Sequence, residues 1–164
     1  KVCKRECNSL YRWQETLWIF KGALILNIAI VVSEFNDKVT SRMHKVALEK
    51  AKGLKLNVKY ECKVPGVFDM PLVIDTLLQK KEVDAVVTLG AIIKGQTKHD
   101  EVIADVVTTR ISKLSIKYQK PISLGISGLA SKEKYLGCVS LKCSSEVAIN
   151  KTISSLSLLI LSSA

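Results

Sequence analysis

Four short apolar segments alternate with amphipathic stretches along this chain. Residues 25–32 and 83–89 are continuous apolar runs rich in β-branched side chains, which is typical of strands buried on both faces. Residues 58–64 alternate apolar and polar side chains, which predicts a second strand with one exposed face. A fourth apolar segment, residues 121–124, predicts the last strand, and we expect residues 125–128 to leave it as a loop.

Between these strands the apolar residues recur at helical spacing. The first such stripe is made of Val39, Met43, Val46, Ala47 and Ala51. Asn36 or Asp37 is predicted to cap this helix and Gly53 to end it. Pro71 suits the first turn of a second helix that runs to about Lys80. A third helix is expected over residues 102–118.

Strands that alternate with helices predict an α/β fold. We expect a three-layer α/β/α sandwich with a four-stranded parallel sheet, right-handed crossovers and helices on both faces. The unusual residues follow the strands: Phe35, residues 68–69, His99 and Gly128. Because ligands of such folds bind at the carboxyl ends of the strands, these loops are expected to line one rim. Their convergence favours a binding site there.

The two ends of the chain differ from this pattern. Residues 1–23 are basic and aromatic, and they are interpreted as an extension with a short docking helix that packs on its own subunit or on a partner. Residues 24–164 are expected to form a single domain. Residues 136–161 have helical potential but poor periodicity and many serines.

Charge and hydropathy narrow the classes of partner. The net charge of +10 is compatible with nucleic acid, a membrane surface or an anionic small substrate. The basic residues are spread along the chain with little aromatic interleaving, so no specific nucleic-acid module is predicted. Lys21 and Asn27 interrupt the apolar run of residues 17–32, and the apolar tail is too short to span, so no membrane segment is predicted.

The five cysteines do not form a recognisable framework. Their number is odd and their spacing irregular, which favours a reducing compartment and a cytoplasmic location over a disulfide scaffold. Cys3 and Cys7 form one neighbouring pair and Cys138 and Cys143 another, but neither has the two-residue spacer usual for zinc. No metal site is therefore predicted.

The segment from Gly90 to Glu101 carries the candidate chemistry. It connects a strand to a helix, and backbone amides near Gly95, Gln96 and Thr97 could bind an anion such as a phosphate at the helix start. His99 lies close by, where it could move protons. A glycine-containing loop before a helix is often only a loop, and Phe35 and Phe68 could simply pack in the core. Both alternatives stay open at this point.

Four motifs in this order resemble lumazine synthase, the family that makes the lumazine precursor of riboflavin, and most closely its archaeal branch. They are Val31-Val-Ser-Glu-Phe-Asn36, Val64-Pro-Gly-Val-Phe-Asp-Met-Pro71, Asp84-Ala-Val-Val-Thr-Leu-Gly-Ala-Ile-Ile-Lys-Gly-Gln-Thr-Lys-His-Asp-Glu101 and Lys120-Pro-Ile-Ser-Leu-Gly-Ile-Ser-Gly128. The resemblance covers about residues 25–128 and implies a flavodoxin-like fold. It also implies condensation of 5-amino-6-(D-ribitylamino)uracil with 3,4-dihydroxy-2-butanone 4-phosphate, without cofactor or metal.

The resemblance also implies roles for individual residues. His99 would be the proton-transfer residue, and Gln96 and Thr97 would take the phosphate. The pyrimidine and ribityl chain would contact Phe35, Val67, Phe68, Asp69, Ala91, Ile92 and Ile93, with Leu124 supplied by a neighbouring subunit. A homo-oligomer is implied, as a pentamer or a sixty-subunit icosahedral shell.

The chain departs from the family pattern toward its C-terminus. Where the family has a basic residue that grips the phosphate, the candidate here is Lys132, in a loop that looks shorter by one residue. The final helix is replaced by a serine-rich segment, and residues 1–23 have no counterpart. Two alternatives to the enzyme therefore stay open: a catalytically weak shell or scaffold that holds anionic cargo, and a flavin- or nucleotide-binding domain of the same fold.

Overall fold

The computed structural model describes residues 26–95 and 98–130, with side chains to residue 127 in the last strand. Several predictions lie outside these described residues: the docking helix of residues 1–23, the phosphate contacts of Gln96, Thr97 and Lys132, and the helical tendency of residues 136–161. Among the helices of the described ranges, none has the length and apolar character needed to cross a membrane.

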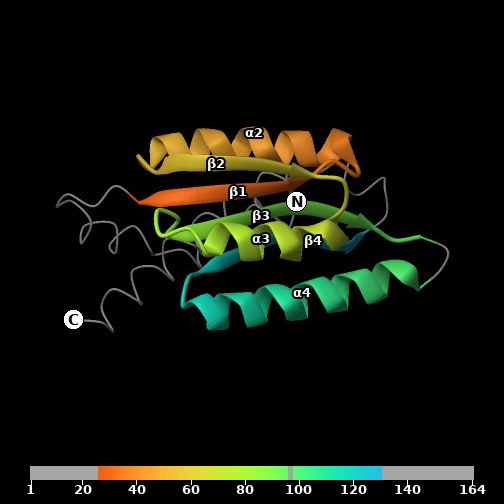
Figure 1. Cartoon of the computed structure of the whole chain (residues 1–164). Coiled ribbons are helices and arrows are strands. Elements are labelled where there is room, and N and C mark those ends of the chain that lie inside the picture. The colour runs from red at the N-terminus through yellow and green to blue at the C-terminus, as the bar shows by residue number, and fades with distance from the viewer. Residues whose placement is uncertain (1–25, 96–97, 131–164) are drawn as a thin grey trace, which may run out of the picture.

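Strands and helices alternate along the described chain. They are β1 (Asn27–Ser33), α2 (Asp37–Gly53), β2 (Asn57–Val64), the 3-10 turn η2 (Val67–Asp69), α3 (Met70–Leu78), β3 (Ala85–Ile93), α4 (His99–Tyr118) and β4 (Ile122–Ala130). The four strands are parallel and lie in the order β2-β1-β3-β4. Helix α2 covers one face of the sheet, and α3 and α4 cover the other (Figure 1). The predicted three-layer α/β/α sandwich is confirmed.

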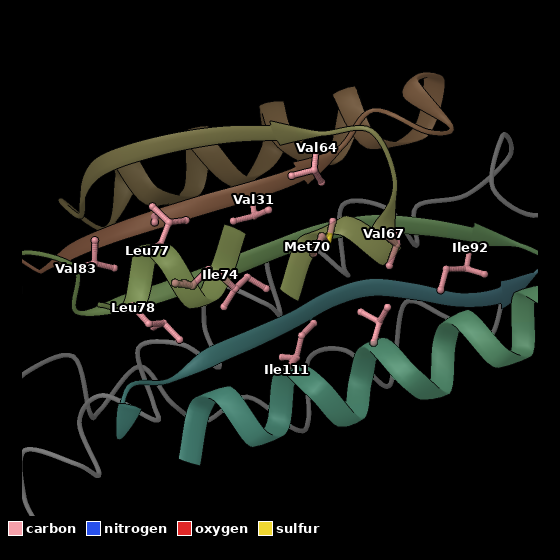
Figure 2. Close-up of a cluster of buried hydrophobic side chains, with 13 residues drawn as sticks. Val31, Val64, Val67, Met70, Ile74, Leu77, Leu78, Val83, Ile92 and Ile111 are labelled. Atoms are coloured by element: carbon pink, nitrogen blue, oxygen red, sulfur yellow. The ribbon is translucent and has the colours of Figure 1, made fainter. Parts of the chain in front are cut away.

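The sheet has a separate apolar core on each face. On the α2 face, alternate residues of β1 and β3 pack against Met43 and Ala47. On the opposite face, the other residues of the same strands pack against α3 and α4, and this second core extends to Val67 and Ile92 (Figure 2). Burial on both faces explains why β1 and β3 read as continuous apolar runs, whereas the edge strand β2 alternates.

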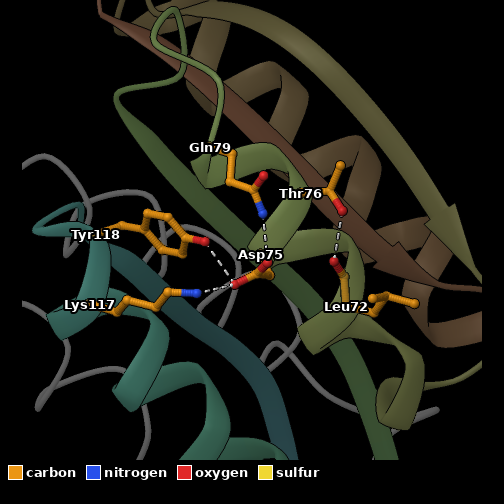
Figure 3. A network of polar contacts seen from close by, with 6 residues as sticks. All are labelled: Leu72, Asp75, Thr76, Gln79, Lys117 and Tyr118. Atoms are coloured by element: carbon orange, nitrogen blue, oxygen red, sulfur yellow. Dashed lines mark hydrogen bonds and ion pairs between the residues drawn. The ribbon is translucent and has the colours of Figure 1, made fainter.

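A polar network joins the two helices that share a face (Figure 3). The Asp75 carboxylate of α3 accepts hydrogen bonds from the Tyr118 hydroxyl at 2.9 Å and the Lys117 ammonium at 3.1 Å, both on α4. It also accepts one from the Gln79 side-chain amide at 2.8 Å. These donors, led by Lys117, hold the pKa of the Asp75 carboxyl below its usual value. The carboxylate therefore links α3 to the end of α4.

Two strands are longer than the sequence predicted. Residues 90–93 continue β3 instead of starting the connection, and residues 125–128 continue β4 instead of leaving it. The reason is their mutual pairing, in which Gly90 lies opposite Ile126 and Ile93 opposite Ala130. Such long-range pairing overrides the local loop signal that the glycines give.

The helix ends also differ in detail. Asn36 precedes α2 in a left-handed conformation, with φ 64°, and its side chain does not cap the helix. Gly53 does end α2 as predicted, but the left-handed residue that turns the chain is Lys55, with φ 57°. Helix α4 begins at His99, three residues earlier than expected, and α3 ends at Leu78 rather than near Lys80. Pro71 lies in the first turn of α3, as predicted.

Candidate functional site

A cavity of about 310 Å³ opens at the carboxyl end of the sheet. Its walls come from the segment after β1, the turn after β2, the end of β3 and the start of α4. The lining residues are Phe35, Asn36, Gly66, Val67, Phe68, Ala91, Ile92, Ile93, His99, Asp100 and Ile103. Three of the four segments expected at this rim therefore surround a cavity, whereas Gly128, the fourth, belongs to β4 and not to a loop after it.

Backbone hydrogen bonds hold the first two loops together. The Glu34 amide donates to the Val64 carbonyl at 2.8 Å, and the Phe35 amide donates to the Pro65 carbonyl at 3.0 Å. These bonds extend the β1–β2 pairing beyond the strands and bring Phe35 to the same cavity as Phe68. The two aromatic side chains are 69% and 62% exposed, so the alternative that they pack in the core is wrong. Both rings are available to a ligand.

Asn36 ties the β1 loop to the end of β3. Its side-chain amide donates to the Ala91 carbonyl at 2.9 Å. The left-handed conformation aims the side chain across the sheet edge, and asparagine tolerates this conformation better than most residues. The sequence suggested only a helix cap here, so the cavity role of Asn36 was missed. In the sequence Asn36 is only an asparagine that follows a strand and an aromatic residue, and this pattern is too common to indicate a cavity residue by itself.

The turn after β2 is stabilised by Asp69. Its carboxylate accepts a hydrogen bond from the Gly66 amide at 2.9 Å, while its own amide donates to the Gly66 carbonyl at 3.2 Å. This closed turn presents Val67 and Phe68 to the cavity. Asp69 itself is not among the cavity-lining residues. The bonds that it makes are those of a turn-stabilising residue.

The start of α4 brings a histidine and a carboxylate to the cavity. His99 is the first residue of the helix and is exposed, whereas Asp100 is only 8% exposed. The Asp100 carboxylate accepts hydrogen bonds from the Gly95 amide at 3.0 Å and the Glu101 amide at 3.1 Å. The bond from Gly95, then that from Glu101, holds the pKa of the Asp100 carboxyl below its usual value. The expectation that the Gly95 amide is free for an anion is thus wrong, because Asp100 already occupies it.

The structure brings most of the expected site residues together and separates two. Those at the cavity are Phe35, Val67, Phe68, Ala91, Ile92, Ile93 and His99. Asp69 stabilises the adjoining turn, and Leu124 lies half-exposed on the edge strand β4, away from this chain's own cavity lining. Gln96, Thr97 and Lys132 lie outside the described residues. The residues that sequence reasoning did not assign to the cavity are Asn36, Gly66, Asp100 and Ile103.

The chemistry of the walls suits a flat, partly polar ligand. Two aromatic rings and the apolar end of β3 offer stacking and apolar contact, and one imidazole can transfer a proton. Within residues 26–95 and 98–130, no group of three His, Cys, Asp or Glu side chains is arranged to hold a metal ion.

Comparison with known proteins extends the resemblance. The family model described as 6,7-dimethyl-8-ribityllumazine synthase matches residues 25–154. The protein of that name from Methanocaldococcus jannaschii is 50% identical over 105 residues, which are 64% of this chain and 74% of the relative. The one from Saccharolobus islandicus is 52% identical over 103 residues, 63% of this chain and 67% of the relative. The one from Pyrobaculum arsenaticum is 54% identical over 104 residues, 63% of this chain and 69% of the relative.

Proposed function

Because the chain belongs to the 6,7-dimethyl-8-ribityllumazine synthase family, we propose that it performs this family's reaction in the cavity at the carboxyl end of the sheet. The observation that carries the proposal is the convergence of three strand ends and the start of α4 on one hollow that contains two exposed aromatic rings and an imidazole. It is a transferase of riboflavin biosynthesis.

The reaction joins two small molecules. The amine of 5-amino-6-(D-ribitylamino)uracil attacks the ketone of 3,4-dihydroxy-2-butanone 4-phosphate, and loss of water gives an imine. Elimination of inorganic phosphate follows, and ring closure with loss of a second water gives 6,7-dimethyl-8-ribityllumazine. Holding the amine and ketone together in one site can lower the barrier by about 7–11 kcal/mol in well-oriented cases.

In our proposal the pyrimidine lies against the exposed Phe35 ring. Val67, Phe68 and residues 91–93 enclose it, because they form the apolar part of the cavity wall. Stacking of a base on an aromatic side chain contributes about 1–3 kcal/mol. One Asp69 carboxylate oxygen accepts the Gly66 amide, and we propose that the other accepts a hydrogen bond from the ribityl chain.

His99 is the proposed proton-transfer residue. It is the only histidine among the cavity-lining residues of the described chain, and the imidazole can accept and donate protons near neutral pH. Gln96 and Thr97 precede it in the chain, and we propose that they take the phosphate, with Lys132 as the neighbouring cation. A lysine would hold the phosphate as a point charge, without the two-pronged contact of arginine.

We further propose that the enzyme is a homo-oligomer, a pentamer or a shell built from pentamers, in which Leu124 completes a neighbouring subunit's cavity. Leu124 is 47% exposed on β4, although it is a large apolar residue. Helix α4 also exposes Val102, Val106 and Ile116, which lie within about 80° of one another at 3.6 residues per turn. An exposed apolar stripe of this kind supports association. We also propose a cytoplasmic location, which the irregular cysteine spacing favours.

A scaffold that holds anionic cargo stays the second candidate. One observation favours it: a cavity of about 320 Å³ between α3 and α4 has three cations in its lining, Arg110, Lys113 and Lys117, against one carboxylate, Asp75. Of these three cations, only Lys117 forms an ion pair within the described residues, and its partner is Asp75. The exposed cations could contact an anionic molecule. A folded protein that keeps both cavities but forms no product from the two substrates would favour the scaffold over the enzyme.

The test is formation of fluorescent product when the purified protein is mixed with the two substrates. We expect the wild-type chain to form 6,7-dimethyl-8-ribityllumazine and His99→Ala to lower kcat by about 10²–10⁴-fold, the usual range for general acid–base groups. The pyrimidine dissociation constant should change little, because His99 is an exposed residue at the rim. If His99→Ala turns over as fast as the wild type at saturating substrate, the proton-transfer role is refuted.

A further inference from the structure

Asp100 is the buried charge of the candidate site. Its side chain joins two parts of the chain, because one carboxylate oxygen accepts the Gly95 amide at 3.0 Å and the other accepts the Glu101 amide at 3.1 Å. Gly95 follows the end of β3, and Glu101 belongs to the first turn of α4. The carboxylate thus joins Gly95 to the first turn of α4, and His99 directly precedes Asp100 in that turn.

The helix start depends on this carboxylate. The cap residue Lys98 makes no side-chain capping bond, and the first amides of a helix have no partner within the helix. Within the described residues, Asp100 supplies the side-chain acceptor for the Glu101 amide in this turn. Because His99 is the first helical residue, the direction of its side chain depends on whether that turn is formed.

A carboxylate at this place also has a cost for the reaction. A phosphate dianion near the same helix start would be repelled by it. The carboxyl is charged at neutral pH because its ordinary pKa of 3.8 lies well below 7, and the hydrogen bonds from Gly95 and Glu101 lower that pKa further. If the site binds a phosphate substrate, the Asp100 carboxylate should therefore have a benefit that offsets this repulsion.

We propose that Asp100 is a positioning residue, which fixes the Gly95 peptide against the first turn of α4 and thereby directs the His99 imidazole into the cavity. The expected effect of Asp100 on catalysis rests on the proposed function. The link between the loop and the helix does not rest on it. Asp100 acts through its neighbours and does not exchange a proton with the substrate.

The test compares Asp100→Asn and Asp100→Ala with a matched control, Glu101→Gln. The control removes the same unit of charge from the next residue, an exposed one, and leaves the backbone amide at that position intact. We expect Asp100→Ala to lower kcat about tenfold, as a small misplacement of a catalytic group can do. Asp100→Asn, which keeps one acceptor oxygen, should lose less, and Glu101→Gln should stay within about twofold of the wild type.

The changes in kcat and KM distinguish a positioning role of Asp100 from an effect of its charge alone. If Asp100 acted only through its charge, Asp100→Asn and Glu101→Gln would shift the pH profile alike and would both lower KM for the phosphate substrate. Positioning instead predicts a loss of kcat specific to Asp100, while the pyrimidine dissociation constant is unchanged. Equal behaviour of the two charge-removing variants would overturn the proposal.

Hydrogen exchange provides a readout that does not need turnover. The amides of Gly95 and Glu101 should exchange faster in Asp100→Ala than in the wild type, and Glu101→Gln should not differ from the wild type. If Asp100→Ala fails to fold by circular dichroism, Asp100→Asn gives the same comparison. Unchanged exchange in both Asp100 variants would overturn the link. An inactive wild type with the expected exchange would instead refute the proposed function and the catalytic consequence, and leave the link supported.

Discussion

Replacing Gly90 with alanine tests how closely the cavity wall is packed against the sheet. A Cβ at this position would lie 2.8 Å from Val67 Cγ2, 3.3 Å from Met70 Cε and 3.5 Å from Ile126 Cγ1. Carbon atoms in good contact are about 3.5–4.0 Å apart, so Val67 would have to retreat by roughly 0.7 Å or more. Met70 can move its flexible end at little cost, whereas Val67 is stiff at χ1.

The expected loss of stability follows from two opposing effects. Overpacking in a core costs about 1–3 kcal/mol. Replacing glycine inside a strand offsets about 0.5–1 kcal/mol of this by reducing the entropy of the unfolded chain. We therefore expect Gly90→Ala to lower the free energy of unfolding by about 1–2 kcal/mol. Because Val67 also lines the cavity, its displacement should raise KM for the pyrimidine as well.

A double-mutant cycle makes this reasoning refutable. Val67→Ala alone should destabilise by about 1–2 kcal/mol through loss of two buried methyl groups. In the double variant the added methyl group fills part of the space that Val67 leaves, so the combined loss should be smaller than the sum by about 1 kcal/mol. The assay is the guanidinium midpoint at one fixed protein concentration, since assembly would shift it. Strict additivity would refute the steric argument.

The same substitution at Gly53 is the matched control. A Cβ at this position meets no atom within 4 Å, and its φ is not in the left-handed region. Gly53→Ala should therefore stabilise the protein by about 0.4–1 kcal/mol. A loss at Gly53 as large as that at Gly90 would mean that the cost at Gly90 does not come from contact with Val67.

Two further predictions concern the helices on that face. Asp75→Asn should lower the unfolding midpoint at pH 7, because it weakens the bonds from Lys117 and Tyr118 to the carboxylate. Since the folded pKa of Asp75 is depressed, this advantage of the wild type is present in full above the ordinary value of 3.8 and is lost as the pH falls through the lower folded value; a difference that does not shrink as the pH falls below 3.8 would contradict it. Val106→Asp should shift the protein to smaller species in light scattering, while the similarly shaped Val106→Thr should not; unchanged assembly in both would exclude this face of α4 from the interface.

The strands and helices could be predicted because their patterns are local. Continuous apolar runs marked β1 and β3, alternation marked β2, and the stripe through Met43 and Ala47 marked α2. The ends of β3 and β4 could not be predicted in the same way. Pairing between Gly90 and Ile126 depends on two strands meeting, and nothing in the local sequence around either residue encodes it.

The residues of the candidate site also fall into those that the local sequence predicts and those that it does not. Phe35, Phe68 and His99 follow the carboxyl ends of strands along the chain, so the alternation of strands and helices predicts that they share a rim. Asn36 and Asp100 could not be assigned this way, because their roles lie in single hydrogen bonds to Ala91 and Gly95. Those bonds depend on backbone positions that only the folded chain defines. The polar residues that organise the cavity were therefore harder to foresee than the apolar ones that line it.

The opposite rim of the sheet has its own character. There the chain turns through the left-handed residues Lys55 and Gln119, and the Lys120 ammonium donates to the Leu78 and Lys80 carbonyls at 2.9 and 2.8 Å. None of these residues lines the candidate cavity. Because parallel strands all run the same way, the described turns at this rim lie a full strand length from the candidate cavity. These turns can therefore be lengthened, changed in sequence or labelled while the candidate cavity keeps its shape.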